Sequence, residues 1–448
     1  MMPIKWKRSG QSIPGSPATG LRRWGGIPGS PATGLRRWGG IPGSPATGLR
    51  SWRSLLLVGA ASLAVASLLT ACQQLTGTLT VDFVYVTSAR ATGSDQYGVV
   101  DVFEINSESG RMRQIPTSPF PSGGRNPVAE VVAPSNNTLY VVNRDDNTIV
   151  QFAIGNDGKL YPQNTVNTPG IFPVATTIQG KNLIVADTFQ PLPTCSPASP
   201  CAGSIAAWPI KSDDSLDTQN PFVNTGINAN YWPLSAPGAP SDVVTPTAVA
   251  ASGSNVFVAA YDVTTNAGYV FGFAVNSNSL APLNGGVPTP AGIHPSAITV
   301  DPSGSYLYVT DFDGNAVLSY SISGGALAPV SGSPFASGNQ PAAIVIASSG
   351  KLAYVANSLD SNITAYSVSA GSLTKIATFA TDTQPVAIGI DPGLNQYLYT
   401  ANFLANTVSG FKIDTSTGTL INSQFSPSSS NPNPTAVAAI PHGAAVTK

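Results

Sequence analysis

The chain has 448 residues, of which only 10% are charged, against about 25% in an average soluble protein. Gly (44) and Pro (39) are abundant, whereas Glu occurs only at Glu104, Glu108 and Glu130. This composition argues against a largely helical protein, because Glu, Lys and Arg normally cover exposed helix surfaces. A hydrophobic content of 42% argues against global disorder. We therefore expect a turn-rich, all-β protein.

The formal net charge of −1 conceals an asymmetry along the chain. Residues 1–71 contain nine basic residues and no acidic one, so the remainder carries 12 basic and 22 acidic residues. Nucleic-acid binding depends on a basic surface that neutralises phosphates. The acidic remainder therefore predicts no nucleic-acid partner.

The first 54 residues form a basic, Pro/Gly-rich extension. Residues 13–26 read IPGSPATGLRRWGG, residues 27–40 repeat them without a change, and a third copy begins at Ile41. Repeats that fold have apolar residues at regular intervals and diverge in sequence. These copies have no such periodicity and are nearly identical. They indicate an expanded coding repeat or a start codon placed too far upstream, and the arginine pairs leave a twin-arginine export signal as the alternative.

An export signal follows in residues 55–72. Arg50 and Arg53 precede the uncharged run Leu55–Leu69, as in a secretory signal. The run is shorter than the roughly 20 residues that a membrane-spanning helix needs.

The end of this signal, Leu69-Thr70-Ala71-Cys72, resembles the bacterial lipobox. That resemblance implies lipidation of Cys72, a short tether over residues 73–78 and a membrane as partner. Gln73 after the cysteine favours the outer membrane, by similarity to enteric sorting rules. We expect an exported, lipid-anchored monomer on the periplasmic or surface side.

The two remaining cysteines, Cys195 and Cys201, enclose a Ser/Pro-rich segment. Outside the cytoplasm, such a pair favours a disulfide. No histidine or acidic residue lies nearby to complete a metal site.

From residue 79 to 448 one pattern recurs every 44 to 49 residues, apart from one interval of 73 residues. A proline opens an alternating apolar strand, a polar turn follows, a second strand reads Tyr-Val-x-Asn/Asp or a variant of it, and two further strands complete the unit. The opening prolines are Pro127, Pro173, Pro246, Pro295, Pro341, Pro385 and Pro434. The second strands begin at Tyr85, Tyr140, Leu183, Phe257, Tyr308, Tyr354 and Tyr399. Repeats of this length with four short strands predict a seven-bladed β-propeller with four-stranded blades.

The series of opening prolines and the series of second strands are out of phase at the chain ends. The first unit begins with its second strand, Asp82–Thr87, and the last proline opens an unpaired strand, Pro434–Ile440. Pairing these two strands would complete the first blade and leave the ring without a free edge.

The Tyr-Val-x-Asn strands and the segments Ser118-Pro119-Phe120 and Ser333-Pro334-Phe335 resemble the seven-bladed lactonase family. That family includes 6-phosphogluconolactonases and is related to YVTN-repeat surface proteins. The resemblance covers about residues 79–441 and implies a propeller fold. It is less specific for activity, because a propeller hosts many functions.

Strand direction places the loops after the second and fourth strands on one face, here called the top face. The residues that close the second strands suit a hydroxyl-rich or other polar ligand. The candidate ligand-binding residues are Asn143, Asp187, Tyr261, Asp311, Asn357 and Asn402. Asn and Asp also cap turns through their own backbone, which is the alternative interpretation of each.

Lactone hydrolysis needs a base for water and a donor for the developing oxyanion. His294, in Gly-Ile-His-Pro, matches the His-Pro pair of the lactonase family, and Arg125 and Arg144 are the candidate phosphate ligands on the top face. No arginine follows Arg144, unlike the arginine-rich cluster of active family members. The sequence therefore favours a binding or interaction module, with a lactonase-type hydrolase as the alternative.

A metal site or cofactor is not expected. Asp311-Phe312-Asp313-Gly314 resembles a fragment of a calcium loop, but the distal Glu of such a loop is missing.

Overall fold

The computed structural model describes residues 81–90, 97–235, 238 and 242–441. The N-terminal extension (1–54), the signal (55–72) with Cys72 and the tether (73–78) lie outside the described residues. Among the residues that are described, no helix is long and apolar enough to cross a membrane.

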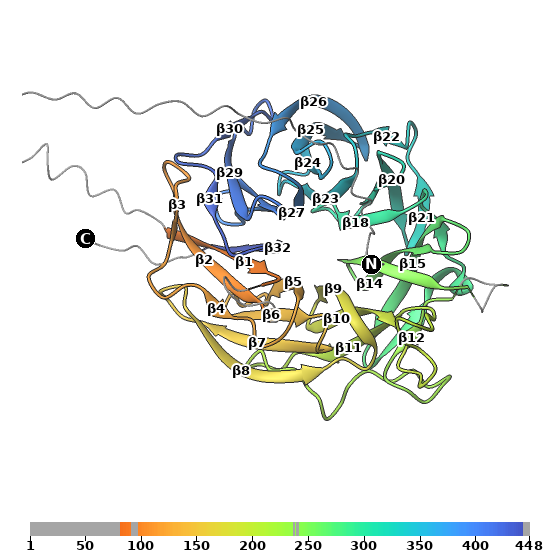
Figure 1. The fold of residues 1–448 in the computed structure, drawn as a ribbon. Coiled ribbons are helices and arrows are strands. Elements are labelled where there is room, and N and C mark those ends of the chain that lie inside the picture. The colour runs from red at the N-terminus through yellow and green to blue at the C-terminus, as the bar shows by residue number, and fades with distance from the viewer. Residues whose placement is uncertain (1–80, 91–96, 236–237, 239–241, 442–448) are drawn as a thin grey trace, which may run out of the picture. The chain divides into compact units, whose positions relative to one another are not determined.

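Seven antiparallel sheets surround a common axis, which confirms the seven-bladed β-propeller (Figure 1). Each innermost strand contacts the innermost strand of the next sheet, and these contacts close the ring. In order from blade one to blade seven, these strands are β32 (Pro434–Ile440), β5 (Pro127–Val132), β9 (Ile171–Gln179), β13 (Val244–Ser252), β18 (Pro295–Val300), β23 (Pro341–Ile346) and β27 (Pro385–Ile390).

The second and third strands of each blade follow outward. The second strands are β1 (Val81–Ser88), β6 (Thr138–Asn143), β10 (Asn182–Phe189), β14 (Asn255–Asp262), β19 (Tyr306–Asp311), β24 (Leu352–Asn357) and β28 (Tyr397–Asn402). The third strands are β2 (Val99–Asn106), β7 (Thr148–Ile154), β11 (Ser204–Pro209), β15 (Ala267–Asn276), β20 (Ala316–Ser323), β25 (Asn362–Ser369) and β29 (Thr407–Ile413).

The outermost strand is continuous in three blades and interrupted in four. The continuous strands are β8 (Leu160–Asn167), β12 (Trp232–Pro233) and β26 (Ser372–Ala380). The interrupted pairs are β3 (Met112–Gln114) with β4 (Phe120–Pro121), β16 (Ser279–Pro282) with β17 (Thr289–Pro290), β21 (Ala326–Pro329) with β22 (Phe335–Ala336), and β30 (Leu420–Asn422) with β31 (Ser428–Ser429). A single 3₁₀ turn, η1 (Leu283–Gly286), lies between β16 and β17.

The core consists of seven apolar clusters, one between each pair of neighbouring blades. The second strands are buried on both faces because a blade packs on either side, and β6, β24 and β28 have no exposed residue. The tyrosine of the Tyr-Val pattern also bridges blades. Tyr85 Oη donates to the Gly158 carbonyl and Tyr354 Oη to the Gly418 carbonyl, each at 3.2 Å. A buried phenol usually finds such a partner, whereas Tyr308 Oη and Tyr399 Oη, at equivalent positions, have none within the described protein.

The ring closes through the C-terminal strand, as the sequence predicts. β32 pairs with β1 in antiparallel register from Phe83↔Ile440 to Ser88↔Pro434. The first blade is therefore built from both ends of the propeller, and its second strand has no free edge.

Candidate functional site

Most of the predicted ligand-binding residues hold loops of their own blade. The side chains of five are buried: Asn143, Asp187, Asp311, Asn357 and Asn402. Asn143 Nδ2 donates to the Ser122 carbonyl at 3.3 Å, and Asn357 Oδ1 accepts from Gly338 N at 3.1 Å. Asn402 Nδ2 donates to Ser409 Oγ at 2.9 Å. Their ligand-binding role stays a prediction, and the geometry supports the alternative interpretation as structural residues.

Asp187 is the most deeply buried acid of this set. Oδ2 accepts from Gly170 N at 3.2 Å, whereas Oδ1 has no hydrogen-bond partner within the described protein. Burial raises the pKa of Asp187 to about 7, since a charged carboxyl is poorly solvated there. A Cβ at Gly170 would lie 2.4 Å from the Asp187 Cβ, so only glycine fits beside this carboxyl.

Tyr261 differs from the other five because it lies in strand β14 past the residue that pairs with the opening proline, Pro246. In blade five the opening proline Pro295 pairs with Asp311, but in blade four Pro246 pairs with Ala260 and the strand continues to Asp262. Tyr261 therefore lies one residue beyond the expected position. It is half-buried, and its ring centroid lies 4.1 Å from that of His294 in the next blade.

His294 is fixed by two backbone hydrogen bonds just before β18. Its N–H donates to Asp311 Oδ1, and its carbonyl accepts from Phe312 N, both at 2.8 Å. Ile293 N donates to the other Asp311 oxygen at 2.9 Å. A Cβ at Gly292, where φ is +75°, would lie 2.1 Å from Asp311 Oδ2. The glycine therefore lets Asp311 hold the loop that carries His294.

The His294 ring has an acidic partner. Nδ1 lies 3.1 Å from Asp313 Oδ2, in the turn between β19 and β20. The Phe312 ring packs at 5.6 Å, and Tyr261 covers another part of the imidazole. We call His294, Asp313, Tyr261 and Phe312 the His294 site.

This arrangement can perform acid–base chemistry. With the Nδ1 proton donated to Asp313, Nε2 carries the lone pair that can accept a proton from water. Burial, and secondly the Asp313 charge, raise the pKa of Tyr261. The phenol therefore keeps its proton over the ordinary pH range and can act as a hydrogen-bond donor.

The two candidate arginines lie together in blade two, away from His294. Arg125 Nε donates to Asp146 Oδ1 at 2.6 Å. The Arg144 guanidinium lies 4.7 Å above the Phe172 ring centre, and its Nη1 is 3.5 Å from Asp145 Oδ1. In Figure 1, β7 and β8 lie across the ring from β20 and β21. Within the described residues, no hydrogen bond, ion pair or ring contact joins either arginine to His294.

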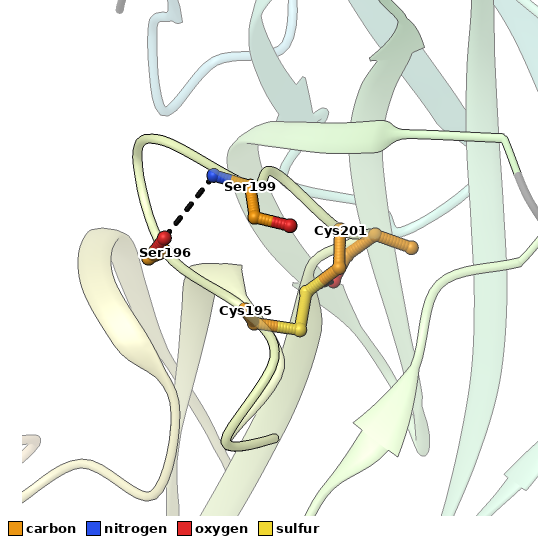
Figure 2. Close-up of a disulfide and its surroundings, with 5 residues drawn as sticks. Cys195, Ser196, Ser199 and Cys201 are labelled. Carbon is orange, nitrogen blue, oxygen red and sulfur yellow. Dashed lines mark hydrogen bonds between the residues drawn. A yellow bond between two sulfur atoms is a disulfide. The ribbon is translucent and has the colours of Figure 1, made fainter.

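The predicted disulfide is present in the loop between β10 and β11. Cys195 and Cys201 are joined with a Cα–Cα distance of 5.5 Å. Inside the loop, Ser199 N donates to Ser196 Oγ at 3.1 Å (Figure 2). The bridge closes a top-face loop of blade three.

Across the described part of the chain, no group of three or more His, Cys, Asp or Glu side chains could hold a metal ion. A crevice of about 110 Å³ between blades four and five includes η1 residues, but no ionisable side chain lines it. The His294 site is therefore the strongest candidate for chemistry.

Comparisons with known proteins agree with this fold. The family model of the lactonase, 7-bladed beta-propeller matches residues 96–189 and 201–439. A protein from Bacteroides uniformis assigned as a 6-phosphogluconolactonase is similar in structure, with a TM-score of 0.63 and 19% identity over 80% of this chain and 99% of that chain. A periplasmic gluconolactonase from Pseudomonas aeruginosa has a TM-score of 0.63 and 18% identity, with the same coverage. No curated protein matches the sequence.

Proposed function

Because the chain belongs to the lactonase family of seven-bladed β-propellers, we propose that it hydrolyses a lactone at the His294 site. The observation that carries this proposal is the 3.1 Å contact between His294 Nδ1 and Asp313 Oδ2, beside the Tyr261 ring. An oriented imidazole next to a phenol supplies both a base and a hydrogen-bond donor.

In the proposed reaction, His294 Nε2 removes a proton from water as the water oxygen bonds to the lactone carbonyl carbon. Tyr261 Oη donates a hydrogen bond to the carbonyl oxygen as negative charge develops on it. The ring C–O bond then breaks, and the imidazolium returns its proton to the leaving alkoxide. Asp313 holds the imidazole in the productive tautomer and stabilises its positive form.

The binding-module interpretation, which the sequence alone favours, is the weaker of the two. Family membership supports the hydrolase, since the matched family is named for lactone hydrolysis. The polar ring that suggested a ligand-binding mouth is mostly buried and bonded to its own loops.

The experiment is hydrolysis of δ-valerolactone, followed by titration of the released acid and corrected for spontaneous opening. We expect His294→Gln to lower kcat/KM by at least about 100-fold, the usual contribution of a general base. Asp313→Asn should lower kcat by a smaller factor. Asp360→Asn is the matched control, because Asp360 lies in the equivalent turn of blade six and binds Asn339 instead. Hydrolysis by His294→Gln at the wild-type rate would overturn the proposal.

We also propose that the protein acts outside the cytoplasm as a lipoprotein anchored through Cys72. Support comes from the lipobox-like sequence at residues 69–72. Cells grown with a labelled fatty acid should label the wild-type protein and leave Cys72→Ser unlabelled. Equal labelling of both would contradict the anchor.

A further inference from the structure

We propose that the substrate is an uncharged lactone bearing an aliphatic chain, and that the chain lies along an apolar rim beside the His294 site. This inference rests on the proposed lactone hydrolysis. It concerns the part of the substrate that lies away from the reacting carbonyl.

The electrostatics around the His294 site disfavour an anionic substrate. In the described stretch 242–441 the only basic residues are three lysines. Lys351 lies in the turn between β23 and β24, on the face opposite His294, and Lys375 and Lys412 lie within β26 and β29. The top-face loops of blades four to seven therefore offer no cation for a phosphate or carboxylate.

Acidic groups occupy these loops instead. They are Asp242, Asp313, Asp360 and Asp382, of which Asp313 contacts His294 directly. A phosphorylated lactone would bring its charge close to these carboxylates without a compensating partner. The arginines that could neutralise it are engaged in blade two with Asp145 and Asp146.

The same loops expose large aliphatic side chains. Ile293, which precedes His294, is 45% exposed, and Val263, two residues after Tyr261, is 37% exposed. Leu359 in blade six and Leu404 in blade seven are 64% and 61% exposed. We call these four residues the apolar rim.

The apolar rim is one part of the top face that exposes large hydrophobic side chains, which also occur at Tyr97 in blade one and Leu192 in blade three. Its members come from the top-face loops of four consecutive blades. The equivalent turn of blade two contains Arg144, Asp145 and Asp146 instead. Exposed aliphatic side chains grouped on one face typically mark a binding surface. Ile293 is next to His294 in the chain and Val263 is two residues from Tyr261, and the Tyr261 and Phe312 rings flank the His294 imidazole.

An alkyl chain on the lactone would gain affinity by covering this surface. Complete burial of a methylene group increases binding about fourfold, and partial burial gives a smaller factor. A chain of several methylenes along the apolar rim should therefore raise kcat/KM by a factor of ten or more. A sugar lactone presents hydroxyl groups to the same surface and gains nothing from it.

The test compares initial rates for δ-valerolactone, δ-octalactone, δ-decalactone, glucono-δ-lactone and its 6-phosphate. We expect kcat/KM to increase at least tenfold from δ-valerolactone to δ-decalactone, with the 6-phosphate hydrolysed most slowly. Ile293→Asn should reduce kcat/KM more for δ-decalactone than for δ-valerolactone. Ile421→Asn is the control, because Ile421 is 65% exposed but lies on the outermost strand β30.

The outcomes separate the two proposals. Hydrolysis of δ-valerolactone without any gain from the chain, or with a preference for glucono-δ-lactone, would overturn the apolar-chain inference and leave lactone hydrolysis intact. Equal losses in Ile293→Asn and Ile421→Asn would also overturn it. If none of the five lactones is hydrolysed, the proposed function itself fails, and the inference fails with it.

Discussion

Glu130 is a buried carboxyl at a position where the other innermost strands carry Val, Ile or Thr. The equivalent residues are Thr176, Val249, Ile298, Ile344, Ile388 and Val437. Thr87 Oγ1 donates to Glu130 Oε2 at 2.6 Å, whereas Oε1 is buried with no partner within the described protein. Burial raises the pKa of Glu130 to about 7. The carboxyl lies between blade two and blade one, the blade that the C-terminal strand completes.

This raised pKa predicts a pH-dependent stability. The folded protein retains a proton on Glu130 that the unfolded chain, with a pKa of 4.5, has already released. The contribution of this group to the free energy of unfolding is therefore fully present below about pH 4.5. This contribution is lost as the pH rises to about 7. We expect Glu130→Gln to raise the melting temperature at pH 8 by several degrees relative to wild type, with little effect at pH 5. Glu108→Gln, at an exposed position, should change neither value.

Gly292 gives a second prediction at the residue scale. Gly292→Ala would place a methyl group 2.1 Å from Asp311 Oδ2 at a φ of +75°, whereas Gly324→Ala, at a φ of +56°, meets nothing within 4 Å. Both variants carry the cost of a left-handed alanine, about 1 kcal/mol. Only Gly292→Ala should also displace the loop of His294 and lower kcat for lactone hydrolysis. Equal activity of the two variants would show that this loop does not position His294.

Neighbouring blades are joined by a repeated hydrogen bond between elements. The turn after the second strand ends in an asparagine with a left-handed backbone, at Asn147, Asn315 and Asn406. The side-chain oxygen of each accepts the N–H of the residue before the next blade's opening proline, at 2.7–2.9 Å. These bonds fix the top-face loops of one blade against the next.

The closing strand β32 is the element on which the ring depends. Deleting residues 434–441 would leave β1 unpaired from Phe83 to Ser88. The loss should be comparable with the whole stability of a domain, about 5–15 kcal/mol. We expect the truncated protein to lose its cooperative thermal transition in circular dichroism. A truncated protein that melts like the full chain would show that the ring closes in another way.

The repeat made the elements predictable from sequence. The seven opening prolines and the closing strand follow from spacing, and the disulfide follows from the cysteine pair together with the expected export, and all three are confirmed. Every opening proline is also followed two residues later by alanine, as in Pro127-Val128-Ala129. This Pro-x-Ala pattern marks the bulge in each innermost strand, where the pairing register with the second strand shifts.

The candidate site was less predictable because it depends on contacts between repeats. The Asp313 contact with His294 arises when the turn after β19 folds back towards the loop before β18. Tyr261 reaches His294 from the residue of β14 just beyond the one paired with the opening proline, and the strand pattern does not reveal this register. Burial of Asn143 and Asn402 likewise depends on packing that a single strand pattern does not contain.

The whole ring divides its top-face chemistry between two regions. Blade two contains the paired arginines and their aspartates, and blades four to seven contain the His294 site, aspartates without an Arg or Lys partner among the described residues and the apolar rim. The family match is interrupted over residues 190–200, which lie in the loop closed by the disulfide.

One measurement tests the location of catalysis directly: kcat/KM for δ-valerolactone in His294→Gln, Arg125→Gln and Arg144→Gln. We expect the histidine variant to lose at least about 100-fold and each arginine variant to stay within about twofold of wild type, because Arg125 is engaged by Asp146 and Arg144 by the Phe172 ring. A 100-fold loss in either arginine variant, with His294→Gln unaffected, would place catalysis in blade two and contradict this account.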